Sequence, residues 1–209
     1  MRLHRTFLAL AAITALIHPL RGEDEHDSEN KFPSPDGKFA FRYEKAEPKE
    51  ETDDEIEVLS LIDPASGKVL LKVAESDPDL GPSARFEMEV LWKPDSKAFA
   101  VTATFTKRGS TLLVFLQKGT EFRAVKLPDL EVEIPDKAKQ GKTFAKTTQI
   151  NSQTARRWQK DGSLVVDVET QEDGGYGSIK ATRTVVLGFD KTGRARVLKS
   201  SVKFAIEKW

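Results

Sequence analysis

Apolar and polar residues alternate with a period of two through most of the chain after residue 32. In the first such run, residues 38–44, Phe39, Phe41 and Tyr43 share one face. Ten similar runs follow, at 55–62, 68–74, 84–92, 97–105, 111–117, 120–126, 153–159, 164–170, 178–189 and 194–207. A period of two is typical of β-strands that bury one face. The pattern therefore predicts eleven strands and no long amphipathic helix.

Short segments rich in proline, aspartate and glycine separate these runs. In residues 34–37 (S-P-D-G) the proline pre-sets the backbone angle, the aspartate can bond back to the chain, and the glycine tolerates positive φ. Similar segments stand at 63–67, 107–110, 118–119 and 190–193. Runs joined by a few residues with a glycine are typical of β-hairpins. We therefore expect an antiparallel meander of hairpins.

One strand–turn–strand pattern occurs three times. It is clearest at residues 92–101 (W-K-P-D-S-K-A-F-A-V), and it recurs at 32–41 (F-P-S-P-D-G-K-F-A-F) and in shorter form at 158–167 (W-Q-K-D-G-S-L-V-V-D). Its aspartates, Asp36, Asp95 and Asp161, lie 59 and 66 residues apart, which leaves room for about four strands in each interval. The sequence thus predicts an all-β fold of about three four-stranded repeats. A β-sandwich of two packed sheets is the alternative.

The repeated W-x-P-D-G/S-K pattern resembles the blade motif of TolB-type β-propellers. The resemblance is carried by residues 34–41 and 92–101, with 158–163 as a third and degenerate copy. It implies a partial, propeller-like array of sheets. It also implies a scaffold that binds partners through loops at one face, more often than an enzyme, although a fold alone does not determine function.

The beginning of the chain has the features of a secretory signal peptide. Arg2, His4 and Arg5 give residues 1–22 a basic start, residues 7–17 form an apolar run too short to span a bilayer, and Pro19 follows. Residues 23–31 are acidic and lack apolar side chains, so we expect a disordered leader before a single all-β domain at 32–209. A secreted or periplasmic protein, with no membrane span once the signal is removed, is the expectation. No cysteine is available for a lipid anchor.

Residues 127–152 interrupt the alternation. Pro128 and Pro135 bracket an acidic stretch, and the residues that follow are rich in lysine with weak helical character. We expect an irregular insertion with one short helix. Its lysines favour a solvated face over a binding face.

Composition excludes several chemistries. The chain has no cysteine and only three histidines, of which His4 and His18 fall in the signal segment and His26 in the acidic leader. Thiolate nucleophiles, cysteine-based metal sites and a histidine general base are therefore not expected, and no motif predicts a cofactor or a metal ion.

The charged residues are unevenly distributed along the chain. Residues 23–60 carry fourteen acidic and five basic side chains, and residues 137–209 carry seven acidic and fifteen basic. No basic cluster is dense enough to predict nucleic-acid binding. Mutual attraction of the two ends is the favoured explanation of this polarity, with partner binding as the other.

Two functions remain open. The first is an exported, non-catalytic scaffold of the bacterial envelope that binds a protein or an envelope polymer. The second is a hydrolase or lyase that acts on a glycan or similar polymer with carboxylates such as Asp167, Glu169 and Asp173. The candidate binding residues are Arg156, Arg157, Asp173 and Tyr176.

Overall fold

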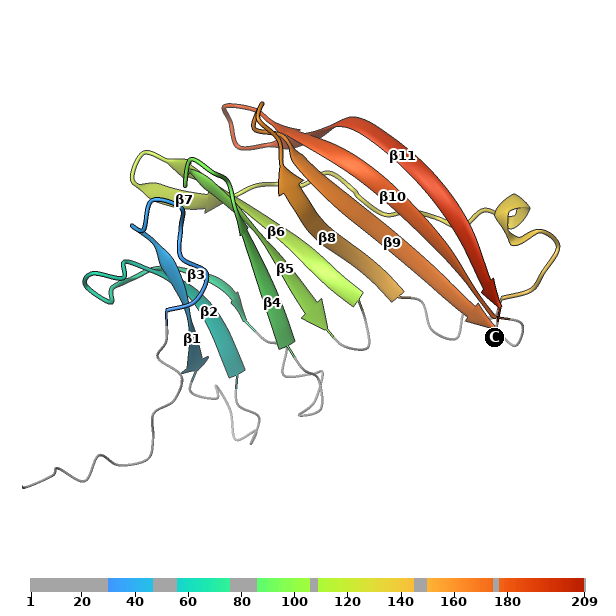
Figure 1. Cartoon of the computed structure of the whole chain (residues 1–209), viewed down its shortest axis with the longest axis horizontal. Helices are drawn as coiled ribbons and strands as arrows, with labels where there is room; N and C mark the ends of the chain where they lie inside the picture. The colour runs from blue at the N-terminus through green and yellow to red at the C-terminus, as the bar shows by residue number, and fades with distance from the viewer. Residues whose placement is uncertain are drawn as a thin grey trace, which may run out of the picture.

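The computed structural model describes residues 30–46, 56–75, 86–105, 109–144, 150–174 and 177–208. In these ranges the chain forms eleven β-strands and one 3-10 helix (Figure 1). The strands are β1 (Ala40–Ala46), β2 (Ile56–Ile62), β3 (Val69–Glu75), β4 (Phe86–Trp92), β5 (Ala98–Phe105), β6 (Gly109–Lys118), β7 (Glu121–Ala124), β8 (Ile150–Trp158), β9 (Leu164–Gly174), β10 (Gly177–Phe189) and β11 (Ala195–Lys208). The 3-10 helix, η2, spans Asp136–Lys139.

The predicted all-β class is confirmed. Each of the eleven predicted strands overlaps an observed one, and no boundary differs by more than four residues. The agreement follows from geometry, since successive side chains of a strand point to opposite faces and one buried face imposes the period of two. The predicted signal segment, residues 1–22, lies outside the described residues, and so does the acidic leader except for Asn30 and Lys31.

The strands form two sheets, in agreement with the two-sheet alternative, and neither sheet closes into a barrel. The smaller sheet has the order β1-β2-β3, and the larger has the order β11-β10-β9-β8-β6-β5-β4 with β7 beside β6. The paired strands are antiparallel except at one place. There β6 and β8 run parallel through only two residue pairs, Gly109 with Asn151 and Ser110 with Ser152. This short contact joins the β4–β7 meander to the β8–β11 meander.

Strand β5 is buried on both faces. Phe99 and Val101 pack in an aromatic core, which also includes Phe41 of the small sheet and Phe115 of β6. Ala100, on the opposite face, belongs to a larger aliphatic core that extends over β9 and β10. The small sheet therefore covers one face of the β4–β6 region, and the β8–β11 half of the chain covers the other.

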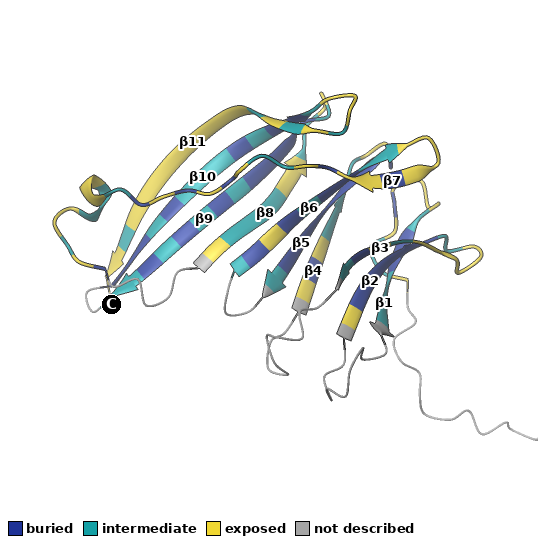
Figure 2. Ribbon diagram, turned by 180° about the vertical axis from the view of Figure 1, so that it is seen from behind, coloured by how far each residue is buried: buried dark blue, intermediate teal, exposed yellow. Residues whose placement is uncertain are grey.

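The segment after β7 covers the back of β9 and β10 (Figure 2). Its alternating apolar side chains Leu130, Val132 and Ile134 are buried in the aliphatic core, as is Phe144. Part of the expected irregular insertion is thus a core element, although it does include a short helical turn, η2. Polar contacts hold the segment in place: Arg183 donates to the carbonyl of Glu131 at 3.1 Å, and Lys139 Nζ lies 3.0 Å from Glu172 Oε2.

The parallel contact between β6 and β8 depends on a glycine. Gly109 has a φ of +97°, and a Cβ placed there would lie 1.7 Å from the backbone oxygen of Asn151. Gly119, in the β6–β7 turn, also has positive φ, but its Cβ would meet nothing within 4 Å.

Gly109→Ala is therefore expected to destabilise the protein more than Gly119→Ala. The control substitution costs only the strain of positive φ, about 1–2 kcal/mol. Gly109→Ala adds an overlap with backbone, which costs roughly 1–3 kcal/mol more because neither strand can move without breaking the contact. Urea denaturation of both variants measures the difference. Equal losses would mean that the two meanders are held together without this contact.

Candidate binding surface

Four turns of similar sequence lie along one edge of the molecule (Figure 1). They precede β1, connect β4 to β5, connect β8 to β9, and connect β10 to β11. We call this edge the turn rim and define it as residues 34–38, 93–97, 159–163 and 190–194. The first three turns belong to the three copies of the repeated motif. Residues distant in sequence therefore meet at one surface.

Two tryptophans of the motif join each copy to the preceding one. The indole N–H of Trp92 donates to the carbonyl of Phe32 at 2.9 Å, and that of Trp158 donates to the carbonyl of Leu91 at 3.0 Å. The two acceptors are equivalent, because Phe32 and Leu91 each lie four residues before the aspartate of their own motif copy. Buried indole N–H groups need such partners. These bonds set the positions of the three turns relative to one another.

A direct contact between turns adds to this arrangement. The backbone N–H of Asp36 donates to Ser96 Oγ at 3.1 Å, which links the first turn to the second. Ser96 is buried and has a φ of +59°, a conformation that non-glycine residues seldom adopt. The strained turn is stabilised by this contact with its neighbour.

Each turn of the rim contains an aspartate whose carboxylate accepts hydrogen bonds from its own turn. Hydrogen bonds from Ser34 Oγ and the Lys38 N–H lower the pKa of Asp36, and those from the Ser163 N–H and Oγ lower the pKa of Asp161. Thr192 and Arg194 act in the same way on Asp190.

Asp95 follows the same pattern in a more buried position. Burial alone would raise the pKa of Asp95, but its hydrogen bonds with Lys93 Nζ and the Lys97 N–H outweigh that effect and lower it. The rim carboxylates are therefore ionised and occupied in holding the turns.

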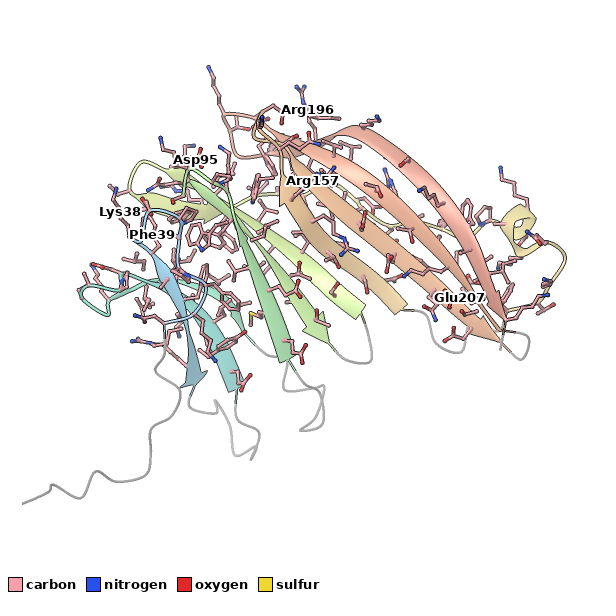
Figure 3. The ribbon with its side chains drawn as sticks, in the orientation of Figure 1. Lys38, Phe39, Asp95, Arg157, Arg196 and Glu207 are labelled. Carbon is pink, nitrogen blue, oxygen red and sulfur yellow. The ribbon has the colours of Figure 1, made fainter. Side chains whose placement is uncertain are left out.

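Several cationic side chains on or beside the rim are exposed to solvent. Among the described residues, six exposed cations on or beside the turns form no ion pair within 4.0 Å: Lys97, Arg157, Lys160, Lys191, Arg194 and Arg196. Figure 3 labels Arg157 and Arg196 near the upper ends of β8 and β11, with Lys38 and Asp95 farther along the same edge. The rim thus presents positive charge to the solvent.

The candidate arginines Arg156 and Arg157 lie together at this edge. A β-bulge between Ala155 and Arg157 places two consecutive residues opposite one partner, so both side chains can reach the same face. Arg156 is paired with Asp167, with 2.7 Å between Nε and Oδ2, whereas Arg157 is exposed and has no such partner among the described residues. Sequence reasoning selected these residues but could not foresee the bulge.

The other two candidates are not brought to the arginines. Asp173 lies near the opposite end of β9 and accepts a hydrogen bond from Gln171 at 2.9 Å. It stands eight residues from Val165, the cross-strand partner of Arg157, which corresponds to about 26 Å of extended strand. Tyr176 lies outside the described residues. Sequence reasoning missed the cations of the β10–β11 turn, for which the only signal was the resemblance of that turn to the motif.

The carboxylates considered for catalysis are engaged with neighbouring side chains. Asp167 accepts from Arg156 and, at 2.8 Å, from Thr184 Oγ1. Glu169 Oε2 lies 2.7 Å from Lys180 Nζ. Both carboxylates lie on the half-exposed face of β9, opposite the aliphatic core.

Within the described ranges, no three or more His, Cys, Asp or Glu side chains are grouped so that they could hold a metal ion. Searches with this chain find no matching protein-family model, no matching curated protein and no matching solved structure. In the same part of the chain, no helix is long and apolar enough to cross a membrane.

Replacing Trp92 or Trp158 with phenylalanine is expected to destabilise the protein by about 1–3 kcal/mol each, because a part-buried hydrogen bond from the indole N–H to a backbone carbonyl is lost. The rim should loosen as well, since the indole bonds connect the motif copies. Urea denaturation measures the first effect, and amide hydrogen exchange of residues 34–38 and 93–97 measures the second. A loss of stability without faster exchange at the turns would contradict the proposed role of the indole bonds.

Acid is expected to weaken the turn rim. The pKa values of Asp36, Asp161 and Asp190 are lower in the folded chain than the value of 3.8 for a free side chain. Their contribution to stability is therefore complete above about pH 4 and is lost as the pH falls through the folded pKa values. Thermal unfolding between pH 7 and pH 2 should reveal this loss. Asp161→Asn should flatten the curve below pH 4, whereas Glu121→Gln, which alters an exposed ion pair with Arg123, should not.

Proposed function

We propose that the protein is a non-catalytic binding scaffold that works outside the cytoplasm and binds an anionic envelope polymer through the turn rim. The single observation that carries the proposal is the division of charge at the rim. Its aspartates are occupied by hydrogen bonds within the turns, whereas six exposed cations near them form no ion pair in the part of the chain that the structure describes. A surface of this kind attracts polyanions.

The rigid support of the rim favours binding over a purely solvated edge. The first three turns are joined by the two indole hydrogen bonds and by the contact between Asp36 and Ser96. Cations held at fixed separations lose less conformational freedom on binding than cations on separate mobile loops. Several turns of similar sequence along one edge suit a partner that itself repeats, such as a polymer with regularly placed phosphate or carboxylate groups.

The second candidate function, a carboxylate-dependent hydrolase or lyase, has less support. Asp167 and Glu169 are each bound to a cation and a hydroxyl group of the protein itself, so both carboxylates are already engaged in structural contacts.

Export is part of the proposal and rests on the signal-like pattern of residues 1–22.

The test is a binding measurement with the chain that begins after residue 22. Polyphosphate and polygalacturonate serve as anionic probes, and dextran serves as the neutral control. Combined charge reversal of Arg157, Lys160 and Lys191 to glutamate should weaken binding of the anionic probes roughly tenfold or more, since each change replaces an attraction with a repulsion. Binding should also weaken with added salt.

A matched control has the same change of net charge away from the rim. Lys72→Glu, Lys137→Glu and Lys208→Glu together alter three other exposed lysines and should leave affinity within about twofold of the parent, because screening confines surface charge effects to about 8–10 Å. Equal losses in both variants would reject the rim as the site. Cleavage of a glycan that is abolished by Asp167→Asn or Glu169→Gln would favour the enzyme instead.

A further inference from the structure

Strand β11 is a long strand at the edge of the larger sheet. It spans fourteen residues, pairs with β10 on one side, and has no described strand on its other side (Figure 1). Its residues are exposed along nearly the whole length, as the yellow ribbon in Figure 2 shows. An edge of this length is a template for another strand, unless the protein protects it.

The backbone groups that point away from β10 can be identified. The N–H of Ala195 donates to the carbonyl of Lys126 at 3.2 Å and therefore points outward. Outward and inward groups alternate along a strand, and the bulge opposite Val186 and Leu187 shifts the alternation by one residue. The outward groups beyond the bulge thus belong to Ser200, Val202, Phe204 and Ile206.

Three of these residues, Val202, Phe204 and Ile206, form an apolar row on the face of the sheet that carries the aliphatic core. Val202 and Phe204 are 44% and 41% exposed, and Ile206 beside them is half-buried against the aliphatic core. An added strand would bring its own side chains opposite them and cover this apolar area.

The opposite face of β11, away from the aliphatic core, carries lysine side chains. Lys199 and Lys203 lie opposite Val186 and Thr182, on the face that also carries Asp167 and Glu169. From Arg196 to Lys208 the strand has four basic side chains and one acidic one. Two β11 strands placed side by side would repel each other, which argues against pairing between copies of this chain.

We propose that the edge of β11 beyond the bulge binds an extended peptide segment of a partner protein, added as an antiparallel strand, in which acidic and apolar residues alternate. Backbone hydrogen bonds to residues 200–206 supply affinity. Acidic side chains opposite Lys199 and Lys203 and apolar side chains opposite Val202 and Phe204 supply specificity. This surface is separate from the turn rim and does not depend on the function proposed there.

The experiment uses the chain that begins after residue 22 and two eight-residue peptides of alternating residues, one with valine and glutamate and one with valine and lysine. Fluorescence anisotropy measures affinity. The glutamate peptide should bind at least tenfold more tightly than the lysine peptide and should slow amide exchange at residues 200, 202, 204 and 206. Equal binding of the two peptides, or no binding of either, would overturn the proposal.

Position 200 provides a matched pair of variants. Ser200→Pro removes an outward N–H without removing a bond to β10, since proline is tolerated at such edge positions. It should reduce binding of the glutamate peptide at least tenfold, whereas Ser200→Ala, which keeps the N–H, should change it less than twofold. Identical affinities for the two variants would show that no strand is added here.

A charge exchange keeps the test decisive if the proline variant does not fold. Lys199→Glu combined with Lys203→Glu should reverse the preference, so that the lysine peptide binds more tightly. An unchanged preference would contradict the assignment of the two lysines. Sedimentation velocity of the protein alone should give a monomer at micromolar concentration. A dimer that Ser200→Pro disrupts would overturn the proposal, because the β11 edge would then bind a second copy of this chain.

Discussion

The burial of β5 on both faces is the constraint on which the rest of the structure depends. Ala98, Phe99, Ala100 and Val101 are almost completely inaccessible to solvent, so the strand requires a covering layer on each side. The small sheet supplies one layer through the aromatic core, and the second half of the chain supplies the other. The short parallel contact of β6 with β8 therefore does not hold the two halves alone, because apolar packing across β5 also joins them.

The same packing determines where the turn rim lies. Trp92 and Trp158 stand at the ends of strands, with their rings against the cores and their indole N–H groups bonded to the previous copy of the motif. Because buried aromatic rings have few alternative positions, the turns that follow them are also confined. The aspartates then close each turn. Positive charge at this edge is consequently a property of the fold, since the local anions are engaged before any partner arrives.

The period-two alternation of apolar and polar residues was sufficient to predict the strands. It could not predict which distant strands pair with one another. The eleven strands follow from alternation within single segments, whereas the parallel contact at Gly109 joins residues more than forty positions apart and has no local signal. The alternation of Leu130, Val132 and Ile134 was present in the sequence, but flanking prolines and lysines obscured it. Arg156 and Arg157 could be selected as candidates. Their separation from Asp173 follows from the length of β9, which the sequence underestimated by four residues.

The uneven distribution of charge along the chain can be compared with the ion pairs in the structure. Sequence reasoning favoured attraction between an acidic first part and a basic last part. In the described residues, however, Asp167 and Glu169 of the last part pair with cations of the same part, and Glu44 of the first part pairs with its neighbour Arg42. Among the described residues, the excess positive charge of the last part thus lies at the rim and along β11. The rim and β11 are both positively charged, but they differ in backbone geometry. The closed turns of the rim offer a partner only side chains, whereas the open edge of β11 also offers backbone hydrogen bonds in a fixed register. The two surfaces therefore suit different partners.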